Sequence, residues 1–182
     1  MKASIYIATS LDGFIARENG ALDWLPGSGG EDSAESSSED FGFKTFMNSV
    51  DVLVMGRNTY EFVLAFDQWL YGDKRVIVLS NTLSEISAKL PKTVELNSGP
   101  PLEIYRELES TGANHVYIDG GKTIQGFLAA GLINDMIITR TPILIGRGIP
   151  LFGALARDKK LRHMETQSFE NGFVQSKYEV LD

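Results

Sequence analysis

Short apolar runs, separated by polar and Gly- or Pro-rich segments, dominate the hydrophobic pattern of this chain. Within each run consecutive residues are apolar, so both faces of the predicted strand would be buried, as in a parallel sheet. Strands are predicted in this way at residues 3–8, 51–56, 75–80 and 115–118, with shorter ones at 14–16 and 93–96. Helices are predicted from residue 57, over 100–111 and over 122–130. This alternation predicts a sheet with helices on both faces.

The C-terminal third of the chain has a different pattern. A long strand is predicted over residues 133–141, followed by a Gly-rich apolar loop over 142–152. Residues 161–169 and 172–180 are expected to form an antiparallel hairpin, because the Glu-Asn-Gly sequence between them is a turn signal. We therefore expect one α/β domain over residues 1–182, with a mixed, mostly parallel sheet and an antiparallel C-terminal hairpin.

A low-complexity segment rich in Ser, Gly and acids occupies residues 27–38. Such a composition cannot bury apolar surface, so we expect a flexible loop, either without a role or acting as a lid. A helix is expected to follow over residues 39–49, capped by Ser37 or Ser38 and with Asp40 in its first turn. Its apolar stripe would consist of Phe43, Phe46, Met47 and Val50.

Composition and charge exclude several classes of function. The chain has 182 residues, no Cys and two His, which excludes a disulfide framework, a thiol nucleophile and a three-His metal site, and no metal is expected. The formal charge is −7, and five of the acidic residues lie within 31–40, which contains no Lys or Arg. This acidic balance disfavours a nucleic-acid or membrane partner. Because the N-terminal residues lack a signal-peptide core, we expect a cytoplasmic protein.

Candidate chemistry lies at the carboxyl ends of the predicted strands, where open α/β sheets bind ligands. Two of these ends are Gly-containing helix starts that carry a cation, and the third is polar: Gly56-Arg57-Asn58-Thr59, Gly120-Gly121-Lys122-Thr123 and Ser80-Asn81-Thr82. Backbone N–H groups at a helix start, together with a cation, suit a phosphate group. Each glycine alone is equally explained by a tight turn, and the Gly-x-Gly-x-x-Gly fingerprint is absent. Together the three segments predict a dinucleotide site.

The order and spacing of these segments resemble the dihydrofolate reductase superfamily. The closer resemblance is to the reductase domain of riboflavin-biosynthesis deaminase–reductases and its stand-alone relatives, and it spans nearly the whole chain. It is carried by Ser-Leu-Asp-Gly-Phe-Ile-Ala at 10–16, Asp-Trp at 23–24, Val-Met-Gly-Arg-Asn-Thr-Tyr-Glu at 54–61, Val-Leu-Ser at 78–80, Ile-Asp-Gly-Gly-Lys at 118–122 and Pro-Ile-Leu-Ile-Gly-Arg-Gly at 142–148. The resemblance implies a three-layer dihydrofolate reductase-like fold. Asp119 stands where dihydrofolate reductases usually have another Gly.

The resemblance also implies NADPH as the cofactor and assigns residues to it. The cofactor phosphates would lie at Gly56, Arg57, Asn58 and Thr59, and the adenosine end at Ser80, Asn81 and Thr82. The pair Gly120-Gly121, often a strained or cis peptide in this fold, would let the cofactor pass closely, with Lys122 and Thr123 at the same helix start. The nicotinamide would be lined by Ala8, Ile15 and Ala16.

On the substrate side, the resemblance places an acid on the helix before the Met-Gly-Arg strand, and Asp40 has that spacing. On a helix over 39–49, Asp40, Phe43 and Met47 would share one face. An apolar pocket there would raise the pKa of the Asp40 carboxyl, so that it could deliver a proton near neutral pH. Alternatively, Asp40 is an ordinary first-turn acid that favours the helix dipole. Trp24 lies where the family has an active-site loop Trp.

Two further groups of residues are candidates around this pocket. Asp12 is a rival to Asp40 as the acid, although it could instead fix its own turn. Arg140 and Arg147 are candidates to bind a substrate phosphate.

Three functions follow from these observations. The resemblance favours an NADPH-dependent reductase of a pterin- or pyrimidine-like heterocycle, of the type that reduces 5-amino-6-(5-phosphoribosylamino)uracil in riboflavin biosynthesis. Dihydrofolate reduction is the second possibility. A nucleotide-binding protein without turnover is the third, and it would not need an acid at Asp40. The family pattern and the apolar C-terminal hairpin region also predict a homodimer.

Overall fold

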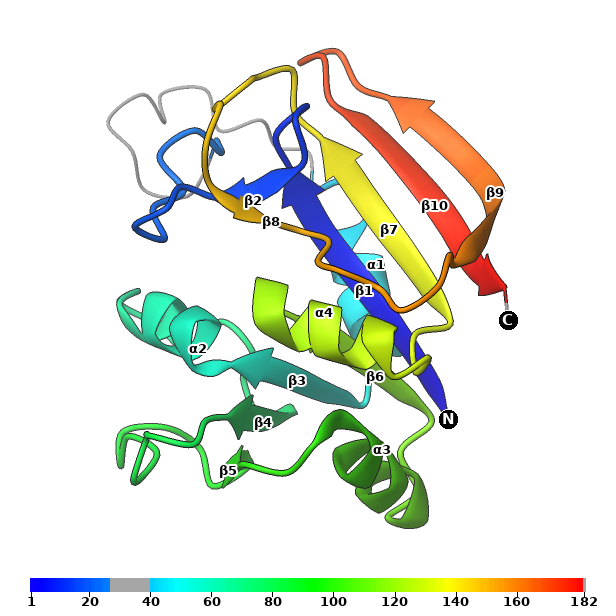
Figure 1. The fold of residues 1–182 in the computed structure, drawn as a ribbon. Helices are drawn as coiled ribbons and strands as arrows, with labels where there is room; N and C mark the ends of the chain where they lie inside the picture. Colours follow the sequence, from blue (N-terminus) through cyan, green and yellow to red (C-terminus); the bar gives the residue numbers. More distant parts are fainter. Residues whose placement is uncertain (27–39, 182) are drawn as a thin grey trace.

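The computed structural model describes residues 1–26 and 40–181, and within these an eight-stranded sheet forms the middle layer (Figure 1). Its strands run in the order β5-β4-β3-β6-β1-β7-β10-β9. Neighbours from β5 to β7 are parallel, whereas β10 is antiparallel to β7 and to β9. The bounds are β1 Lys2–Thr9, β3 Val52–Gly56, β4 Arg75–Leu79, β5 Val94–Asn97, β6 His115–Asp119, β7 Asp135–Arg140, β9 Lys160–Ser168 and β10 Val174–Leu181. The predicted mixed sheet with an antiparallel C-terminal hairpin is confirmed.

A second, two-stranded sheet lies over the carboxyl end of β1. It pairs β2 (Phe14–Ala16) with β8 (Ile149–Pro150) in antiparallel orientation. The β8 strand lies within the segment 142–152 that was predicted as a loop. Two residues, one of them Pro, are too short for any alternation of apolar and polar positions to be visible, so β8 is formed by its partner and not by its own pattern.

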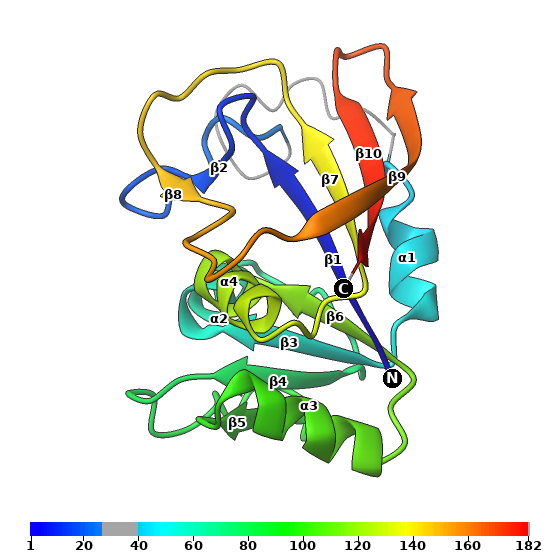
Figure 2. The same cartoon turned by 45° about the vertical axis from the view of Figure 1, so that its right-hand side comes forward.

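Helices cover both faces of the large sheet (Figures 1 and 2). On one face lie α1 (Phe43–Ser49) and α2 (Arg57–Leu64), and on the other lie α3 (Pro101–Ser110) and α4 (Gly121–Ala129). The molecule therefore has three layers, as predicted. None of the helices that the structure describes is long and apolar enough to cross a membrane.

The two faces of β3 show why its sequence is apolar at successive positions. Val52 and Val54 belong to the core beneath α3 and α4, while Leu53 and Met55 belong to the core beneath α1 and α2. Val54, Leu53 and Met55 are fully buried. Burial of both faces confirms the prediction of central, doubly covered strands.

The helix predicted over residues 39–49 begins later, at Phe43. Phe41 and Gly42 have φ angles of 55° and 84°, which are incompatible with a continuing helix, so Asp40 lies before the helix and not in its first turn. The Asp40 carboxylate instead accepts hydrogen bonds from the backbone N–H groups of Gly42 and Lys44, at 2.9 and 3.1 Å. The predicted loop at 27–38, the capping Ser37 or Ser38, and Glu39 lie outside the described residues.

Truncation of the core beneath α4 tests this packing. Phe127 is 1% exposed and packs in the same cluster as Ile124 and Leu108. We expect Phe127→Ala to lower the free energy of unfolding by about 3–5 kcal/mol, because it removes buried apolar area and leaves a cavity. Urea unfolding measures the change. Leu102→Ala, at a residue of α3 that is 43% exposed, is the control and should change it by less than about 1 kcal/mol. Equal losses in both variants would contradict the described core.

Candidate functional site

The three segments predicted to bind the cofactor meet at one edge of the sheet. The strands β4, β3 and β6 are neighbours, and the register places Gly56 beside Leu79 and Met55 beside Asp119. Their carboxyl ends therefore bring together the start of α2, the polar residues 80–82 and the start of α4. Proximity of these segments was expected from parallel pairing, and the structure supplies the strand order that produces it.

Two glycines allow the starts of α2 and α4 to approach each other closely. A Cβ atom at Gly120 would lie 2.5 Å from Oγ1 of Thr59, and one at Gly56 would lie 2.9 Å from Oγ1 of Thr123. Both distances are too short for any side chain. Gly120 also has a φ of +88°, a conformation that residues with a Cβ rarely adopt. The described part of the chain has no cis peptide, so the special geometry of the glycine pair resides in this dihedral angle.

The backbone N–H groups at both helix starts are free of side-chain caps. Gly56 and Gly120, the residues at the two N-caps, have no side chain that could accept hydrogen bonds from the N–H groups of α2 and α4. The first N–H groups of a helix have no partner within the helix, and its N-terminus carries a partial positive charge. Two such ends side by side form a site suited to an anion that accepts several hydrogen bonds, such as a pyrophosphate.

Two cations flank this pair of helix starts. The Arg57 guanidinium is oriented by two hydrogen bonds, from Nε to the Glu61 carboxylate at 2.6 Å and from Nη1 to Oγ1 of Thr82 at 2.8 Å. Arg57 thus links the helix start to the polar segment 80–82. Lys122 is exposed and forms no ion pair with any residue in the described ranges.

The polar segment after β4 is shaped by Ser80. Its hydroxyl oxygen accepts hydrogen bonds from the backbone N–H groups of Thr82 and Leu83, at 3.2 and 2.9 Å. Asn81 and Thr82 are exposed at this turn. Ser80 is therefore occupied in forming the turn, and the exposed amide of Asn81 is available to a ligand.

Of the residues predicted to line the nicotinamide, Ile15 lies next to the glycine pair. A Cβ at Gly121 would be 2.8 Å from Cδ1 of Ile15 and 3.4 Å from Cγ2 of Ile149, so the small β2–β8 sheet packs on the start of α4. Ala16 is 8% exposed. Ala8, near the end of β1, is paired with Thr139 in the neighbouring strand β7.

Asp12 holds two loops of the site together. Its carboxylate accepts hydrogen bonds from the Ser10 hydroxyl at 2.6 Å and from the backbone N–H of Gly146 at 2.8 Å. The hydrogen bond from Ser10 and those from the backbone lower the pKa of the Asp12 carboxyl. This geometry agrees with the expectation that Asp12 fixes its turn.

The substrate-side residues are only partly assembled as predicted. Asp40 is fully exposed, and hydrogen bonds from the N–H groups of Gly42 and Lys44 lower its pKa, so the expectation of a raised pKa is wrong. The reason is that Asp40 precedes the helix and accepts hydrogen bonds from N–H groups at its N-terminus.

The apolar substrate-side residues belong to α1. Phe43 contacts the ring of Tyr6 edge-on at a centroid distance of 5.3 Å, and Met47 packs against the same core. Asp40 therefore does not share a helix face with Phe43 and Met47.

Trp24 is 8% exposed, and its Nε1 has no hydrogen-bond partner among the described residues. A buried N–H group without a partner costs free energy in the folded chain. The substrate-binding role of Trp24 stays a prediction.

Asp119 is the functional candidate that the sequence reasoning missed. It is the last residue of β6, directly before the glycine pair, and its Oδ1 accepts a hydrogen bond from the Gly120 N–H at 2.8 Å. Burial raises the pKa of its carboxyl to about 6, against the opposing effect of hydrogen bonds from Gly120 and Tyr117. The available signal is an acid at the end of an otherwise apolar strand, at a position where dihydrofolate reductases usually have a Gly.

The sequence and the fold of this chain are similar to those of known proteins. The family model described as the RibD C-terminal domain matches residues 3–175. The uncharacterised protein YwjB of Bacillus subtilis (strain 168) is 34% identical over 169 residues, which cover 92% of each chain. A crystal structure from Shewanella sp. PV-4, assigned provisionally to riboflavin biosynthesis, is 42% identical, with a TM-score of 0.90 over the whole of both chains. Dihydrofolate reductase from Enterococcus faecalis, complexed with NADP(H), shares the fold at 15% identity, with a TM-score of 0.68 over 100% of this chain and 97% of that one.

The raised pKa of Asp119 predicts a specific dependence of stability on pH. Its folded-state pKa of about 6 exceeds the value of about 3.9 for an unfolded Asp, so its contribution to stability is fully present below pH ~4 and is lost as the pH rises through ~6. Replacement by Asn removes this loss. We expect the effect of Asp119→Asn on the free energy of unfolding to be more favourable at pH 8 than at pH 4, by about 2 kcal/mol.

Urea unfolding at the two pH values measures this difference. Asp73→Asn, at an exposed Asp, is the matched control and should show a much smaller pH-dependent difference. If Asp119→Asn has the same effect at pH 4 and pH 8, the carboxyl does not titrate as described.

Proposed function

The chain belongs to the RibD C-terminal domain family, and we propose that it is an NADPH-dependent reductase of a pterin- or pyrimidine-like heterocycle. The substrate that we favour is 5-amino-6-(5-phosphoribosylamino)uracil, because it is the compound that a reductase of the riboflavin type would reduce. The observation that carries the cofactor proposal is the pair of adjacent, uncapped helix starts at Gly56 and Gly120.

The residues at this edge fit a phosphate-containing cofactor. The N–H groups that begin α2 and α4 would bind the pyrophosphate, with Lys122 supplying a positive charge. Arg57 is held at Thr82, beside the turn expected to bind the adenosine end. A guanidinium at that place suits an additional phosphate on the adenosine ribose, which favours NADPH over NADH.

NADPH, when bound, supplies a hydride, and this chain must orient the acceptor and provide the matching proton. The β2–β8 sheet, with Ile15 against the glycine pair, would exclude water from the nicotinamide end. Reduction of a C=O or C=N bond places the hydride on carbon and a proton on the oxygen or nitrogen. A donor of that proton works best when its pKa lies near the operating pH.

Two carboxyl groups divide the substrate-side tasks in this proposal. Asp119, with a pKa raised to about 6, is suited to hold the proton near neutral pH and deliver it directly or through water. Asp40, whose pKa is lowered, is ionised at that pH and is suited to accept hydrogen bonds from the N–H groups of a heterocycle. The assignment of the proton donor thus moves from Asp40 to Asp119, while Asp40 keeps a place at the site.

A substrate phosphate requires positive charge near the substrate end. Arg140 at the end of β7 and Arg147 in the loop before β8 are both exposed. Neither forms an ion pair with any residue within 1–26 or 40–181. These two guanidinium groups suit an anionic substrate group, which is the phosphate in the aminouracil compound and the glutamate carboxylates in dihydrofolate. They therefore support an anionic substrate, and the choice between the two rests on the family resemblance.

Cofactor binding tests the first part of the proposal. We expect NADPH to bind more tightly than NADH, and Arg57→Ala to weaken NADPH binding about 10- to 100-fold, because a hydrogen-bonded charge is removed. Fluorescence titration measures both affinities. Arg106→Ala, at an exposed Arg on α3, is the matched control and should bind NADPH as the unaltered chain does. A chain that binds neither nucleotide would refute the proposal.

Turnover tests the second part. We expect NADPH oxidation with the aminouracil phosphate, and not with dihydrofolate, and a kcat that falls as the pH rises above about 6. Asp119→Asn should lower kcat by about 10²-fold and abolish this fall, whereas Asp40→Asn should act mainly on KM. Initial rates from pH 5 to 9 distinguish the two.

Each alternative outcome has a defined meaning. An unchanged pH profile in Asp119→Asn, together with a loss of kcat of about 10²-fold in Asp40→Asn, would identify Asp40 as the proton donor. Binding of NADPH without oxidation of it, with either substrate, would favour the nucleotide-binding protein without turnover.

A further inference from the structure

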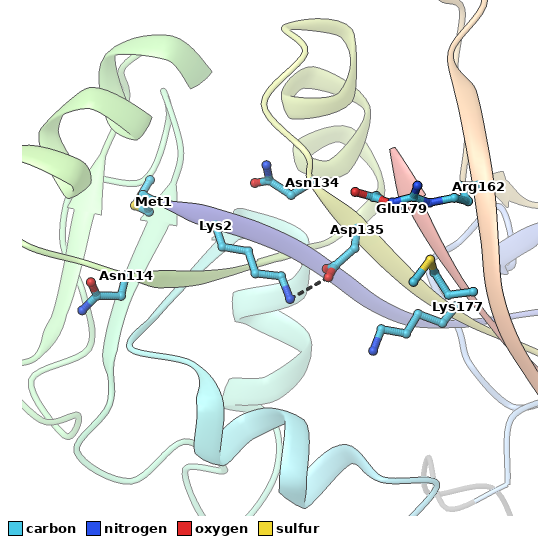
Figure 3. A pocket seen from close by; sticks show the side chains of 9 residues that line it. Met1, Lys2, Asn114, Asn134, Asp135, Arg162, Lys177 and Glu179 are labelled. Carbon is cyan, nitrogen blue, oxygen red and sulfur yellow. Dashed lines mark hydrogen bonds and ion pairs between the residues drawn. The ribbon is translucent and has the colours of Figure 1, made fainter. Parts of the chain in front are cut away.

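A cavity lies near the amino ends of β1 and β7, but its charges are already paired. It has a volume of about 650 Å³ and is lined among others by Lys2, Asp135, Arg162 and Glu179 (Figure 3). Lys2 Nζ lies 2.6 Å from the Asp135 carboxylate, and Arg162 forms an ion pair with Glu179. Because these cations have carboxylate partners, the cavity is a poor site for a small anion. The polar contacts that concern the substrate side lie toward the opposite ends of the same strands.

One side chain near those ends connects three strands to the segment before α1. Nε2 of Gln175, in β10, lies 3.1 Å from the carbonyl oxygen of Phe41. The same nitrogen lies 2.9 Å from Oγ1 of Thr139 in β7 and 3.1 Å from the hydroxyl oxygen of Tyr6 in β1. An amide NH₂ group has two hydrogens, so these acceptors share them. Gln175 therefore fixes the Phe41 carbonyl to the sheet.

Tyr6 donates a second hydrogen bond to the same carbonyl. Its hydroxyl oxygen lies 2.5 Å from the carbonyl oxygen of Phe41. The Tyr6 ring packs against Phe43 and Phe46 of α1, at centroid distances of 5.3 and 4.9 Å. Burial raises the pKa of the Tyr6 hydroxyl, so this group stays protonated and remains a donor at neutral pH. The Phe41 carbonyl thus accepts hydrogen bonds from side chains on two different strands.

The ring of Phe41 is held by the turn of the C-terminal hairpin. It contacts the Phe169 ring edge-on at a centroid distance of 4.8 Å and stacks on the Phe173 ring at 5.3 Å. The turn is closed by a hydrogen bond of 2.9 Å from the Phe169 N–H to the Phe173 carbonyl. The hairpin region was expected to be apolar, but β9 is exposed at all nine positions and is mostly polar. Two of its apolar residues, Phe169 and Phe173, instead lie at the turn, where they contact Phe41.

These contacts explain an unfavourable backbone conformation. Phe41 has a φ of 55°, which costs free energy in a residue with a Cβ atom, and Gly42 follows with a φ of 84°. Such a conformation persists only where the surroundings impose it, and here both the carbonyl and the ring of Phe41 are fixed. The resulting bend brings the Asp40 carboxylate to the N–H groups of Gly42 and Lys44. The orientation of Asp40 therefore depends on the contacts of the residue that follows it.

We propose that Gln175 is a positioning residue, which holds the Asp40 carboxylate at the substrate side of the site by anchoring Phe41. This inference rests on the proposed function, in which Asp40 accepts hydrogen bonds from a heterocycle. Gln175 itself acts only through Phe41. Its partner Thr139 is also paired with Ala8, one of the residues expected to line the nicotinamide, so the anchor lies at the end of the sheet that the substrate would approach.

Nuclear magnetic resonance tests the anchoring without requiring turnover. The N–H groups of Gly42 and Lys44 lower the pKa of the Asp40 carboxyl, and the charge of Lys44 acts in the same direction. Gln175→Leu should loosen the bend and raise that pKa toward about 3.9, because hydrogen bonds to the ionised form are lost. The ¹³C shift of the Asp40 carboxyl, followed against pH, measures it. Gln167→Leu, at the exposed Gln opposite on β9, is the matched control and should leave the pKa unchanged.

A second variant, Tyr6→Phe, removes the other donor to Phe41 and keeps the ring. Tyr6 is uncharged at the acidic pH of this titration, so the change alters no charge near Asp40. The pKa of Asp40 should rise in this variant too, which keeps the test decisive if Gln175→Leu folds poorly. An Asp40 pKa that is the same in the unaltered chain and in both variants would overturn the proposal.

Kinetics test the consequence for the substrate. Gln175→Leu should reproduce the effect of Asp40→Asn: KM for the aminouracil phosphate rises about 10-fold, while kcat and the dissociation constant of NADPH change little. In the Asp40→Asn background, Gln175→Leu should have little further effect, because both changes remove the same contact. Equal effects in the two backgrounds, or a loss of NADPH affinity, would show a merely structural role and overturn the proposal. If no substrate is reduced, the proposed function fails, while the pKa of Asp40 still decides whether Gln175 positions it.

Discussion

The close approach of α2 to α4 is the constraint on which the candidate site depends. Both helices start at the carboxyl ends of neighbouring strands, and hydroxyl groups of Thr59 and Thr123 occupy the space where side chains of Gly120 and Gly56 would otherwise be. Because the two helix starts are in contact, their uncapped N–H groups face one region. A wider separation would leave two weak anion sites in place of one that can span a pyrophosphate.

In the described part of the chain, the charged and polar groups at the amino ends of the parallel strands are paired with one another, whereas several cations at the carboxyl ends are not. At the amino edge polar groups satisfy one another: the His115 ring is within 2.7 Å of the Ser4 hydroxyl, and the Asp51 carboxylate accepts the N–H groups of Asn114 and His115. At the carboxyl edge the cations Lys122, Arg140 and Arg147 have no ion-pair partner among the described residues. The first arrangement stabilises the fold, and the second leaves charge available to ligands.

Much of the fold could be predicted because its determinants are local. Consecutive apolar residues, as in Val52 to Met55, report burial on two faces, and glycines followed by cations mark the helix starts. Features that depend on distant partners could not be predicted in the same way. The β8 strand forms only against β2, and the pKa of Asp119 depends on how deeply β6 is buried. Asp40 was predicted to lie inside the helix, because nothing in the sequence at Phe41 indicates the left-handed backbone conformation that precedes α1.

The two glycines at the helix starts impose different rules on how this sequence can diverge. Gly56 has an ordinary extended conformation, with φ −80°, and only the Thr123 hydroxyl excludes a methyl group there. Alanine therefore fits at position 56 once Thr123 has been replaced by a smaller residue that lacks the hydroxyl, so the order of the two substitutions matters. Gly120, with φ +88°, is restricted by its own backbone as well as by Thr59. No single change elsewhere relieves that restriction, and lineages descending from this chain should drift at position 56 well before they drift at position 120.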